Sequence, residues 1–290
     1  EYDNSAGNQI YRECWGGENH HLGICDDVDD FYHAAKKANE NLVGKLRIDP
    51  ECSILDIGSG FCGLPRFIAR NTPCRRITAL NISDKENDFA RRKNDEEGLG
   101  DMISVIEADY NDMPFADDEF DILVSQDSML HSPDKKMLLR ECARVLKKGG
   151  QFVFSDILEE STLSREEAER IYARVRVPHL SSFHYYRREL PKAGFNVDEV
   201  QDLGSENLAK SYQAVHDILS GKKDRLVKEV DVPLDVIENA LAGLSYWVEK
   251  ALERKIGAAL FAATYRRAER ATVYKMRDRQ YTSSTSHEHS

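Results

Sequence analysis

The sequence predicts an α/β protein in which a mostly parallel β-sheet is covered by helices on both faces. From residue 52 to about residue 158, short apolar segments alternate with helical segments. A glycine-rich turn, residues 58–63, joins the first apolar segment to the helix that follows it. Strands that alternate with helices at this spacing form parallel sheets, because each helix carries the chain back to the same edge.

Seven apolar segments predict the strands. Five of them alternate with helices, the sixth follows a mainly helical region, and the last fits an antiparallel strand that completes the sheet. The predicted strands are residues 53–57, 77–82, 102–107, 120–125, 151–158, 196–203 and 260–265.

Helices are predicted from apolar residues at a spacing near 3.6 and from capping residues. Residues 29–46 show this spacing before the first strand, and Ser132-Pro133-Asp134 begins a helix that we expect to end at Gly149-Gly150. Other predicted helices are residues 64–70, the segments that follow Ser83 and Ser164, and residues 186–193, 205–219 and 233–252.

The composition is that of a globular protein with an acidic surface. Of 290 residues, 41% are hydrophobic and 31% charged, and 40 basic against 51 acidic residues give a formal net charge of −11. This length suits one large domain or two small ones. An acidic chain without a basic stripe disfavours nucleic-acid binding, and no apolar stretch approaches the roughly 18 residues of a membrane span.

The six cysteines are scattered, without a Cys-x-x-Cys pair or a suitably spaced histidine. This pattern favours reduced, buried thiols and disfavours a zinc site, so we expect a cytoplasmic protein without a metal. The chain begins at Glu1 and not at Met, which leaves an upstream targeting segment open.

The segment around the glycine-rich turn is the most informative part of the chain. Gly58 and Gly60 allow a sharp reversal and a close approach of ligand to backbone, as in turns that bind nucleotide-like ligands. Asp56 would repel a pyrophosphate but suits an amine and a sugar hydroxyl. No lysine follows the turn, which excludes a P-loop.

The pattern Asp-x-Gly-x-Gly after the first strand resembles the first motif of class I S-adenosylmethionine (SAM) methyltransferases. The resemblance implies a Rossmann-like, seven-stranded, mostly parallel sheet with helical substrate-cap insertions, SAM as cofactor and S-adenosylhomocysteine as product. It further implies that Asn81 reaches the ribose, where an acid is usual, and that Asp109 accepts from the adenine amino group. Residues 124–133 then lie where cofactor and substrate meet.

Further segments resemble the sarcosine/dimethylglycine N-methyltransferase group, and more loosely tocopherol and phosphoethanolamine methyltransferases. The likeness covers about residues 8–265, and Tyr246-Trp247 stands where the group has His-Trp. It implies that residues 11–17 fold over the cofactor, with Tyr11 near the methyl group. The segments that carry it are residues 11–18, 80–83, 125–132 and 141–147.

The acceptor side departs from that group. Pro178-His179 and Ser181-Ser182 replace a His-Asp pair and Gly-Ser, His184 replaces a glycine, and Ala258-Ala259 replaces Trp-Gly. The change at Ala258 opens volume while His184 fills it elsewhere, so the resemblance leaves the acceptor undetermined. Cys62 stands where the group has another glycine, which predicts a turn that needs no positive φ at that residue.

We expect three parts: an N-terminal helical lid (residues 1–50), a methyltransferase domain (51–270) and a flexible tail (271–290). Within the domain, helical insertions at about 159–193 and 205–253 form the substrate cap.

Methyl transfer from a sulfonium needs positioning and a neutral nucleophile, and no nucleophilic side chain. His131, after the fourth strand, is the candidate to accept the proton of an amine or to orient it, and a capping or core histidine is the alternative. The predicted catalytic residues are His131 and Tyr11. The predicted cofactor-binding residues are Tyr11, Trp15, Gly16, Asp56, Gly58, Gly60, Asn81, Ile82, Asp109, Tyr110 and Gln126, and the predicted substrate-binding residues are Asp127, His131, His184 and Tyr186.

These features predict a SAM-dependent methyltransferase that acts on a small amine such as sarcosine or dimethylglycine. One alternative is transfer to oxygen, sulfur or carbon of a larger specialised metabolite, and another is a SAM-binding protein without catalysis. Product analysis and turnover on an amine panel distinguish the three. We expect a monomer or homodimer whose partner is a small-molecule acceptor, with no nucleic acid and no membrane span.

Overall fold

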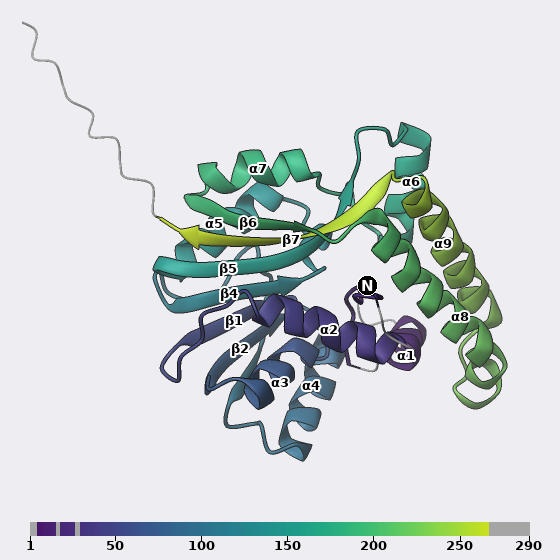
Figure 1. Cartoon of the computed structure of the whole chain (residues 1–290). Helices are drawn as coiled ribbons and strands as arrows, with labels where there is room; N and C mark the ends of the chain where they lie inside the picture. Colours follow the sequence, from purple (N-terminus) through teal and green to yellow (C-terminus); the bar gives the residue numbers. More distant parts are fainter. Residues whose placement is uncertain (1–4, 16–17, 27–29, 267–290) are drawn as a thin grey trace, which may run out of the picture.

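The computed structural model, which describes residues 5–15, 18–26 and 30–266, contains one seven-stranded sheet (Figure 1). Its strands are β1 (Ser53–Ile57), β2 (Arg76–Asn81), β3 (Ile103–Glu107), β4 (Phe120–Gln126), β5 (Leu146–Glu159), β6 (Phe195–Asp202) and β7 (Ile256–Tyr265). Their order is β3-β2-β1-β4-β5-β7-β6. The first five strands pair in parallel, and β7 is antiparallel to both β5 and β6. The predicted fold class is confirmed.

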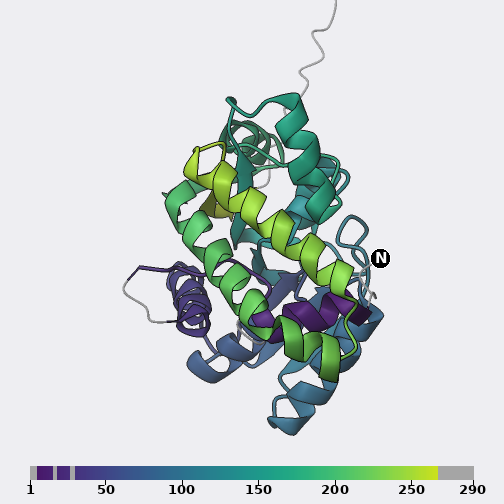
Figure 2. The same cartoon turned by 90° about the vertical axis from the view of Figure 1, so that its right-hand side faces the viewer.

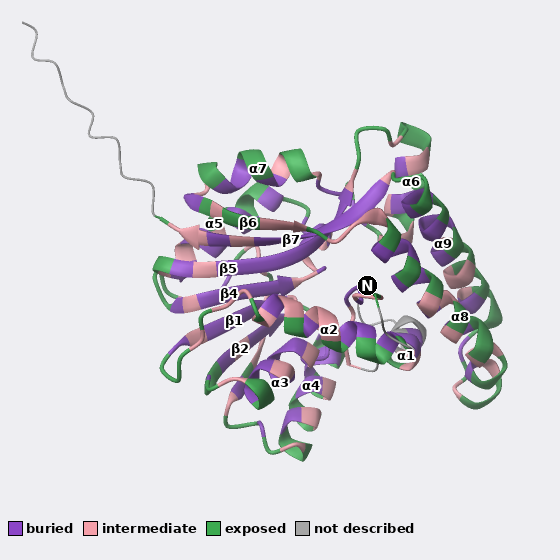
Figure 3. Cartoon of the chain, viewed as in Figure 1, coloured by how far each residue is buried: buried purple, intermediate pink, exposed green. Residues whose placement is uncertain are grey.

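Helices cover both faces of the sheet. In Figure 3 the central strands are accordingly coloured mostly as buried. Successive residues of β1 point to opposite faces: Leu55 and Ile57 pack with residues of two helices on one side, and Ile54 with residues of three helices on the other. The first side is covered by α5 (Lys135–Val145) and α7 (Phe183–Lys192), and the second by α2 (Phe31–Val43), α3 (Gly63–Asn71) and α4 (Asp84–Glu96).

The remaining helices form a cap beyond the carboxyl ends of the parallel strands (Figures 1 and 2). The cap consists of α1 (Ser5–Cys14), α6 (Arg165–Val175), α8 (Ser205–Glu229) and α9 (Leu234–Leu252). Its core contains Tyr212 and Trp247 and extends to Leu130 and Ile157 at the sheet, so cap and sheet share one apolar cluster. Among the helices that the structure describes, none has the length and apolar character required to cross a membrane.

The predicted end of the helix before β5 is wrong. Helix α5 ends at Val145, and Gly149-Gly150 lie within β5. Leu146 is already paired with Phe120 of β4, and the register then shifts, so the glycines occupy an irregular stretch of the strand. Sheet pairing therefore ends the helix before the glycines are reached.

Two other helices are longer than predicted. Helix α7 begins at Phe183 and not at residue 186, because the Ser182 side chain caps it. Helix α8 continues past residue 219 to Glu229, and Leu226 in this extension is buried in the cap core. The predicted tail, residues 271–290, lies outside the described residues.

Residues 18–25, which we call the strap, join the sheet to the cap. Glu18 forms an ion pair with Arg66 of α3, with 2.7 Å between Oε2 and Nη2, and the Arg66 side chain is fully buried. On the cap side, Asn207 Nδ2 of α8 donates to the Gly23 carbonyl at 2.9 Å. The strap therefore holds the two parts of the molecule together from a segment before the first strand.

The close contact between the strap and Gly63 leads to a prediction. A Cβ at Gly63 would lie 2.4 Å from Asn19 Oδ1 and 2.5 Å from the Glu18 carbonyl oxygen. Because overpacking destabilises proteins by about 1–3 kcal/mol, we expect Gly63→Ala to lower stability by this amount and to loosen the strap. Hydrogen exchange at residues 18–25 measures the effect.

The control is Gly221→Ala in α8, where a Cβ would meet nothing within 4 Å. We expect this variant to be stabilised by about 0.5–1 kcal/mol through helix propensity, with unchanged exchange in the strap. Unchanged strap exchange in Gly63→Ala would contradict the prediction.

Candidate active site

The glycine-rich turn between β1 and α3 is fixed by conformation and by packing. Gly58 has φ +72° and Gly60 φ +51°, in the left-handed region that favours glycine. A Cβ at Gly58 would also lie 2.3 Å from Ser128 Oγ. The Gly58 N–H donates to the Leu80 carbonyl of β2 at 2.8 Å, which ties the turn to the neighbouring strand.

Cys62 corrects one expectation. Its φ is +62°, so the turn does adopt a left-handed conformation at the position where the resembling group has glycine. A non-glycine residue in this region is strained by about 1–2 kcal/mol. The thiol side chain is buried in an apolar cluster with Leu64 and Ile68, and this burial offsets the strain.

The predicted cofactor residues gather at the carboxyl edge of four adjacent parallel strands. Asp56 lies near the end of β1, Asn81 ends β2 and Gln126 ends β4. Asp109 and Tyr110 follow β3. Parallel strands bring their carboxyl ends to one edge, which is where open α/β sheets bind ligands.

Three of these residues have defined surroundings. The Tyr110 hydroxyl donates to the Ser128 carbonyl at 3.2 Å, and its ring lies 3.7 Å from the position of a Cβ on Gly58. Asp109 Oδ1 accepts from the Asn111 N–H at 2.7 Å. Gln126 Oε1 is buried and has no hydrogen-bond partner among the described residues. Tyr110 and the turn thus form one wall of the site.

Glu86 is a candidate site residue that the sequence analysis missed. Asn81 Nδ2 donates to Glu86 Oε2 at 2.9 Å, and Glu86 Oε1 lies 3.9 Å from His20 Nδ1 of the strap. A carboxylate from α4 therefore stands beside Asn81, at the strand end where an acid is usual. The signal in the sequence is an acid five residues after Asn81, which also fits a helix-capping pattern.

A pocket lies between the strap, the end of β4 and the cap, and we call it the cap pocket. Its lining combines predicted site residues with residues that the sequence analysis did not select, which come mainly from the strap, α6 and α8. The pocket meets the glycine-rich turn through His20, whose Nδ1 lies 3.6 Å from the position of a Cβ on Gly60. The lining residues are Trp15, His20, Leu22, Asp127, Leu130, His131, Ile157, Arg174, Val175 and Tyr212.

His131 is held in the cap pocket as a neutral imidazole. It lies in a short 3₁₀ helix, η1 (Met129–His131), directly after β4. Burial, reinforced by the positive charge of Lys135, lowers the pKa of His131 to about 4. Lys135 Nζ is itself held by backbone carbonyls, including those of Leu130 and His179 at 3.3 Å. At neutral pH the imidazole is thus a hydrogen-bond acceptor and a weak base.

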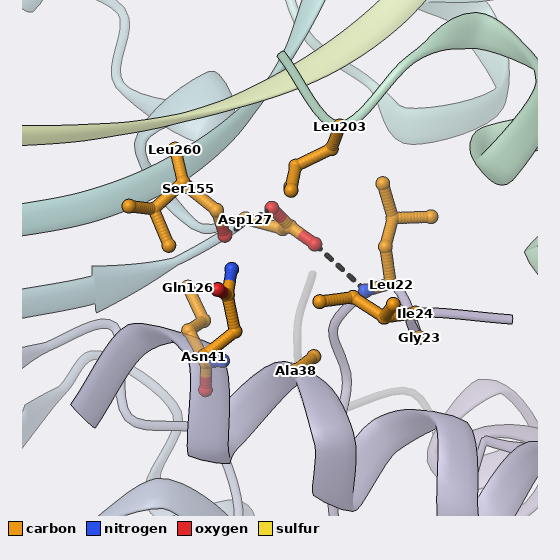
Figure 4. A pocket seen from close by; sticks show the side chains of 10 residues that line it. All are labelled: Leu22, Gly23, Ile24, Ala38, Asn41, Gln126, Asp127, Ser155, Leu203 and Leu260. Carbon is orange, nitrogen blue, oxygen red and sulfur yellow. Dashed lines mark hydrogen bonds between the residues drawn. The ribbon is translucent and has the colours of Figure 1, made fainter. Parts of the chain in front are cut away.

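Asp127 lines both the cap pocket and a second, smaller cavity, which Figure 4 shows. Its Oδ2 accepts from the Leu22 N–H of the strap at 2.7 Å, and its Oδ1 accepts from Ser155 Oγ at 2.6 Å. The backbone at Asp127 is left-handed, with φ +49°. The carboxylate therefore holds the strap at the end of β4 while it also lines the cap pocket.

Two predicted substrate residues do not reach the pocket. Tyr186 is fully buried in the core, and its hydroxyl donates to Asp156 Oδ2 at 2.5 Å. His184 is exposed on α7, which packs on one face of the sheet. Neither residue lines either cavity, because α7 covers a face of the sheet and not its carboxyl edge.

The predictions for the N-terminal segment are described in part. Trp15 is buried, lines the cap pocket and packs edge-on against Tyr212, with ring centroids 6.0 Å apart. Gly16 and the side chain of Tyr11 lie outside the described part of the structure.

Comparison with known proteins identifies the family. Residues 55–154 match the methyltransferase domain family. The chain is 32% identical over 249 residues to the sarcosine/dimethylglycine N-methyltransferase of Halorhodospira halochloris, covering 85% of this chain and 88% of that protein. The chain belongs to this methyltransferase family. A dimethylglycine N-methyltransferase of Parasynechococcus marenigrum is also 32% identical, covering 86% of this chain and 88% of that protein.

A solved structure agrees with the methyltransferase fold. A protein from Galdieria sulphuraria, assigned as a sarcosine dimethylglycine methyltransferase, superposes with a TM-score of 0.82 at 26% identity. The match covers 90% of this methyltransferase and 98% of the other chain. The similarity thus includes the cap as well as the sheet.

The packing at Gly58 predicts a strong effect of a single methyl group. We expect Gly58→Ala in this methyltransferase to lower stability by about 2–4 kcal/mol, because left-handed strain and the clash with Ser128 act together. Gly98→Ala is the matched control, since Gly98 has φ +68° but nothing within 4 Å of a Cβ. Chemical denaturation measures both, and equal losses of stability would contradict a packing role for Ser128.

Asp56 predicts a pH effect. Burial raises the pKa of its carboxyl to about 8, against about 3.9 in an unfolded chain. Between these values the folded protein keeps a proton that the unfolded chain has released, so stability falls as pH rises. We expect Asp56→Asn to gain in Tm relative to the wild type from pH 5 to pH 8. The exposed Asp101→Asn serves as control, and parallel Tm profiles for wild type and Asp56→Asn would refute the prediction.

Proposed function

We propose that this methyltransferase transfers the methyl group of SAM to the nitrogen of sarcosine, dimethylglycine or a closely related amino acid. The observation that carries the proposal is the cap pocket, in which a neutral His131 lies at the end of β4 and His20 adjoins the glycine-rich turn. The substrates named for the two relatives that match most of the chain support an amine acceptor.

The residues at the carboxyl edge fit SAM. A left-handed turn without Cβ atoms at Gly58 and Gly60 supports close approach of the ligand to the backbone. The unpartnered Gln126 Oε1 supports a ligand donor beside β4. Ile82, which is 51% exposed directly after β2, offers an apolar surface for an adenine ring.

Different polar residues of this edge would bind different parts of the cofactor. Asn81 and Glu86 would bind the ribose hydroxyls, Asp109 the adenine amino group, and Asp56 the amine of the methionine portion. When bound, SAM supplies a methyl group on a sulfonium, which carries its own leaving group.

The residues of the cap pocket prepare the acceptor. The acceptor nitrogen would have to be neutral, because its lone pair would form the bond to the methyl carbon as the carbon–sulfur bond breaks. After transfer, the methylated sarcosine loses its remaining N–H proton. Dimethylglycine sheds its ammonium proton on binding, so its methylated product has no N–H proton to lose. For sarcosine, whose neutral amine keeps one N–H, His131 accepts a hydrogen bond from that N–H and aligns the nitrogen. The low pKa of the imidazole favours this orienting role over that of a general base.

Variants of His131 test the proposal. We expect His131→Ala to lower kcat for sarcosine by about 100-fold through misalignment, and His131→Gln, which retains an acceptor, to lose less than about tenfold. Mass spectrometry of products from sarcosine, dimethylglycine and bulkier amines measures the turnover. His33→Ala, at an exposed histidine of α2, is the matched control.

The pH dependence separates the two roles of His131. If His131 only orients the acceptor, kcat/KM should rise with pH in His131→Gln as it does in the wild type, because that rise reports the deprotonation of the acceptor amine. Loss in His131→Gln of a separate limb near pH 4, the pKa of the imidazole, would identify a general base. Absence of methylated product from every amine, with SAM still bound, would overturn the proposed function.

A further inference from the structure

Arg174 lies in a cage of three aromatic rings. Its guanidinium carbon is 4.9 Å from the ring centroid of Trp247, 5.0 Å from that of Tyr212 and 5.8 Å from that of Trp15. The three rings come from α9, α8 and the segment after α1, and Arg174 itself comes from the last turn of α6. Four separate segments of the chain therefore meet around one positive charge.

In the described part of the structure, aromatic rings and no counterion surround the charge of Arg174. Among the residues that the structure describes, the Arg174 guanidinium forms no ion pair and donates no hydrogen bond, although the chain has 51 acidic residues against 40 basic ones. By contrast, Arg66 pairs with Glu18 and Arg144 with Glu141. Aromatic faces attract a guanidinium but leave its N–H donors unsatisfied. The cage therefore holds the cation in place and keeps its donors available.

Two neighbours of Arg174 fit this view. The Nε1 of Trp247 is buried and has no acceptor among the described residues, so the cage contains a second donor without a partner. Gly243 of α9 lies against the stem of Arg174, where a Cβ would be 3.1 Å from Cδ. A glycine inside a helix is unfavourable for the helix, and here it leaves space for the arginine.

Arg174 lines the cap pocket together with His131 and Asp127. We infer that Arg174 and its aromatic cage bind the carboxylate of the methyl acceptor, which makes them the specificity site for amino acids over other amines. A guanidinium binds a carboxylate through two parallel hydrogen bonds, while Asp127 and His131 suit the amine end of the same zwitterion. This inference rests on the proposed function.

Replacement of the guanidinium tests the inference. We expect Arg174→Met to raise KM for dimethylglycine by about 10- to 100-fold with kcat changed less than about threefold, because a charge-assisted contact is lost. N,N-dimethylethanolamine, which carries a hydroxyl in place of the carboxylate, should show the same KM in wild type and variant. Arg174→Lys keeps the positive charge but not the planar, two-pronged guanidinium. Its KM for dimethylglycine should lie between those of the wild type and Arg174→Met.

The matched control is Arg170→Met, one turn earlier on α6. Its guanidinium carbon lies 3.8 Å from the ring centroid of Tyr246, and it does not line the cap pocket. This variant loses a comparable cation–π contact, but away from the cap pocket. Both KM values should therefore stay unchanged. An equal rise in KM for the two acceptors in Arg174→Met would show a purely structural role and overturn the inference.

Binding without turnover separates this inference from the proposed function. Calorimetric titration of glycine betaine into the protein with S-adenosylhomocysteine should show binding to wild type and Arg170→Met, and a loss of at least tenfold in affinity for Arg174→Met. Betaine binding that depends on Arg174, without methylation of any amine, would refute the proposed function and retain the carboxylate site. Methylation of dimethylglycine with an unchanged KM in Arg174→Met would refute the carboxylate site alone.

Discussion

The contact of Ser128 with the end of β1 sets the positions of the groups at the site. Its hydroxyl donates to the Ile57 carbonyl at 2.9 Å and lies 2.7 Å from Ser125 Oγ, while its own carbonyl accepts from Tyr110. The same hydroxyl occupies the space beside Gly58 that any side chain would need. One residue therefore connects the turn after β1, the loop after β3 and the helical turn that carries His131. Movement of any of these would disturb the other two.

The electrostatic arrangement of the cap pocket follows from how each charge is satisfied. Burial, together with the positive charge of Lys135, keeps the imidazole of His131 neutral, and backbone carbonyl oxygens hold Lys135 in place. Asp127 accepts from the strap and from Ser155, so each of its buried oxygens has a hydrogen-bond donor. Among the described residues, the guanidinium of Arg174 is stabilised by aromatic rings and not by an acid. The pocket thus presents one cation with unsatisfied donors beside a neutral imidazole.

Local sequence predicts the sheet and the glycine-rich turn well, because apolar runs and left-handed glycines act within a few residues. It fails at Gly149-Gly150, where pairing of Leu146 with a distant strand ends the helix first. Resemblance places His184 along the chain but does not reveal that α7 covers a face of the sheet. The cage around Arg174 is beyond sequence reasoning for a related reason: its rings come from residues 15, 212 and 247, and only tertiary packing brings them together.

The strap also bears on how this protein can evolve. The donor side of the site is built from strand ends, which are tied to one another by sheet hydrogen bonds and tolerate little change. Much of the acceptor side is built from the strap, α6 and α8, which contribute no strand, and its remaining residues follow α1 or β4 or lie in β5. Mutations in these segments can alter the acceptor while the donor side stays intact. The division between the two sides gives the fold a route to new acceptors by exchange of the cap alone.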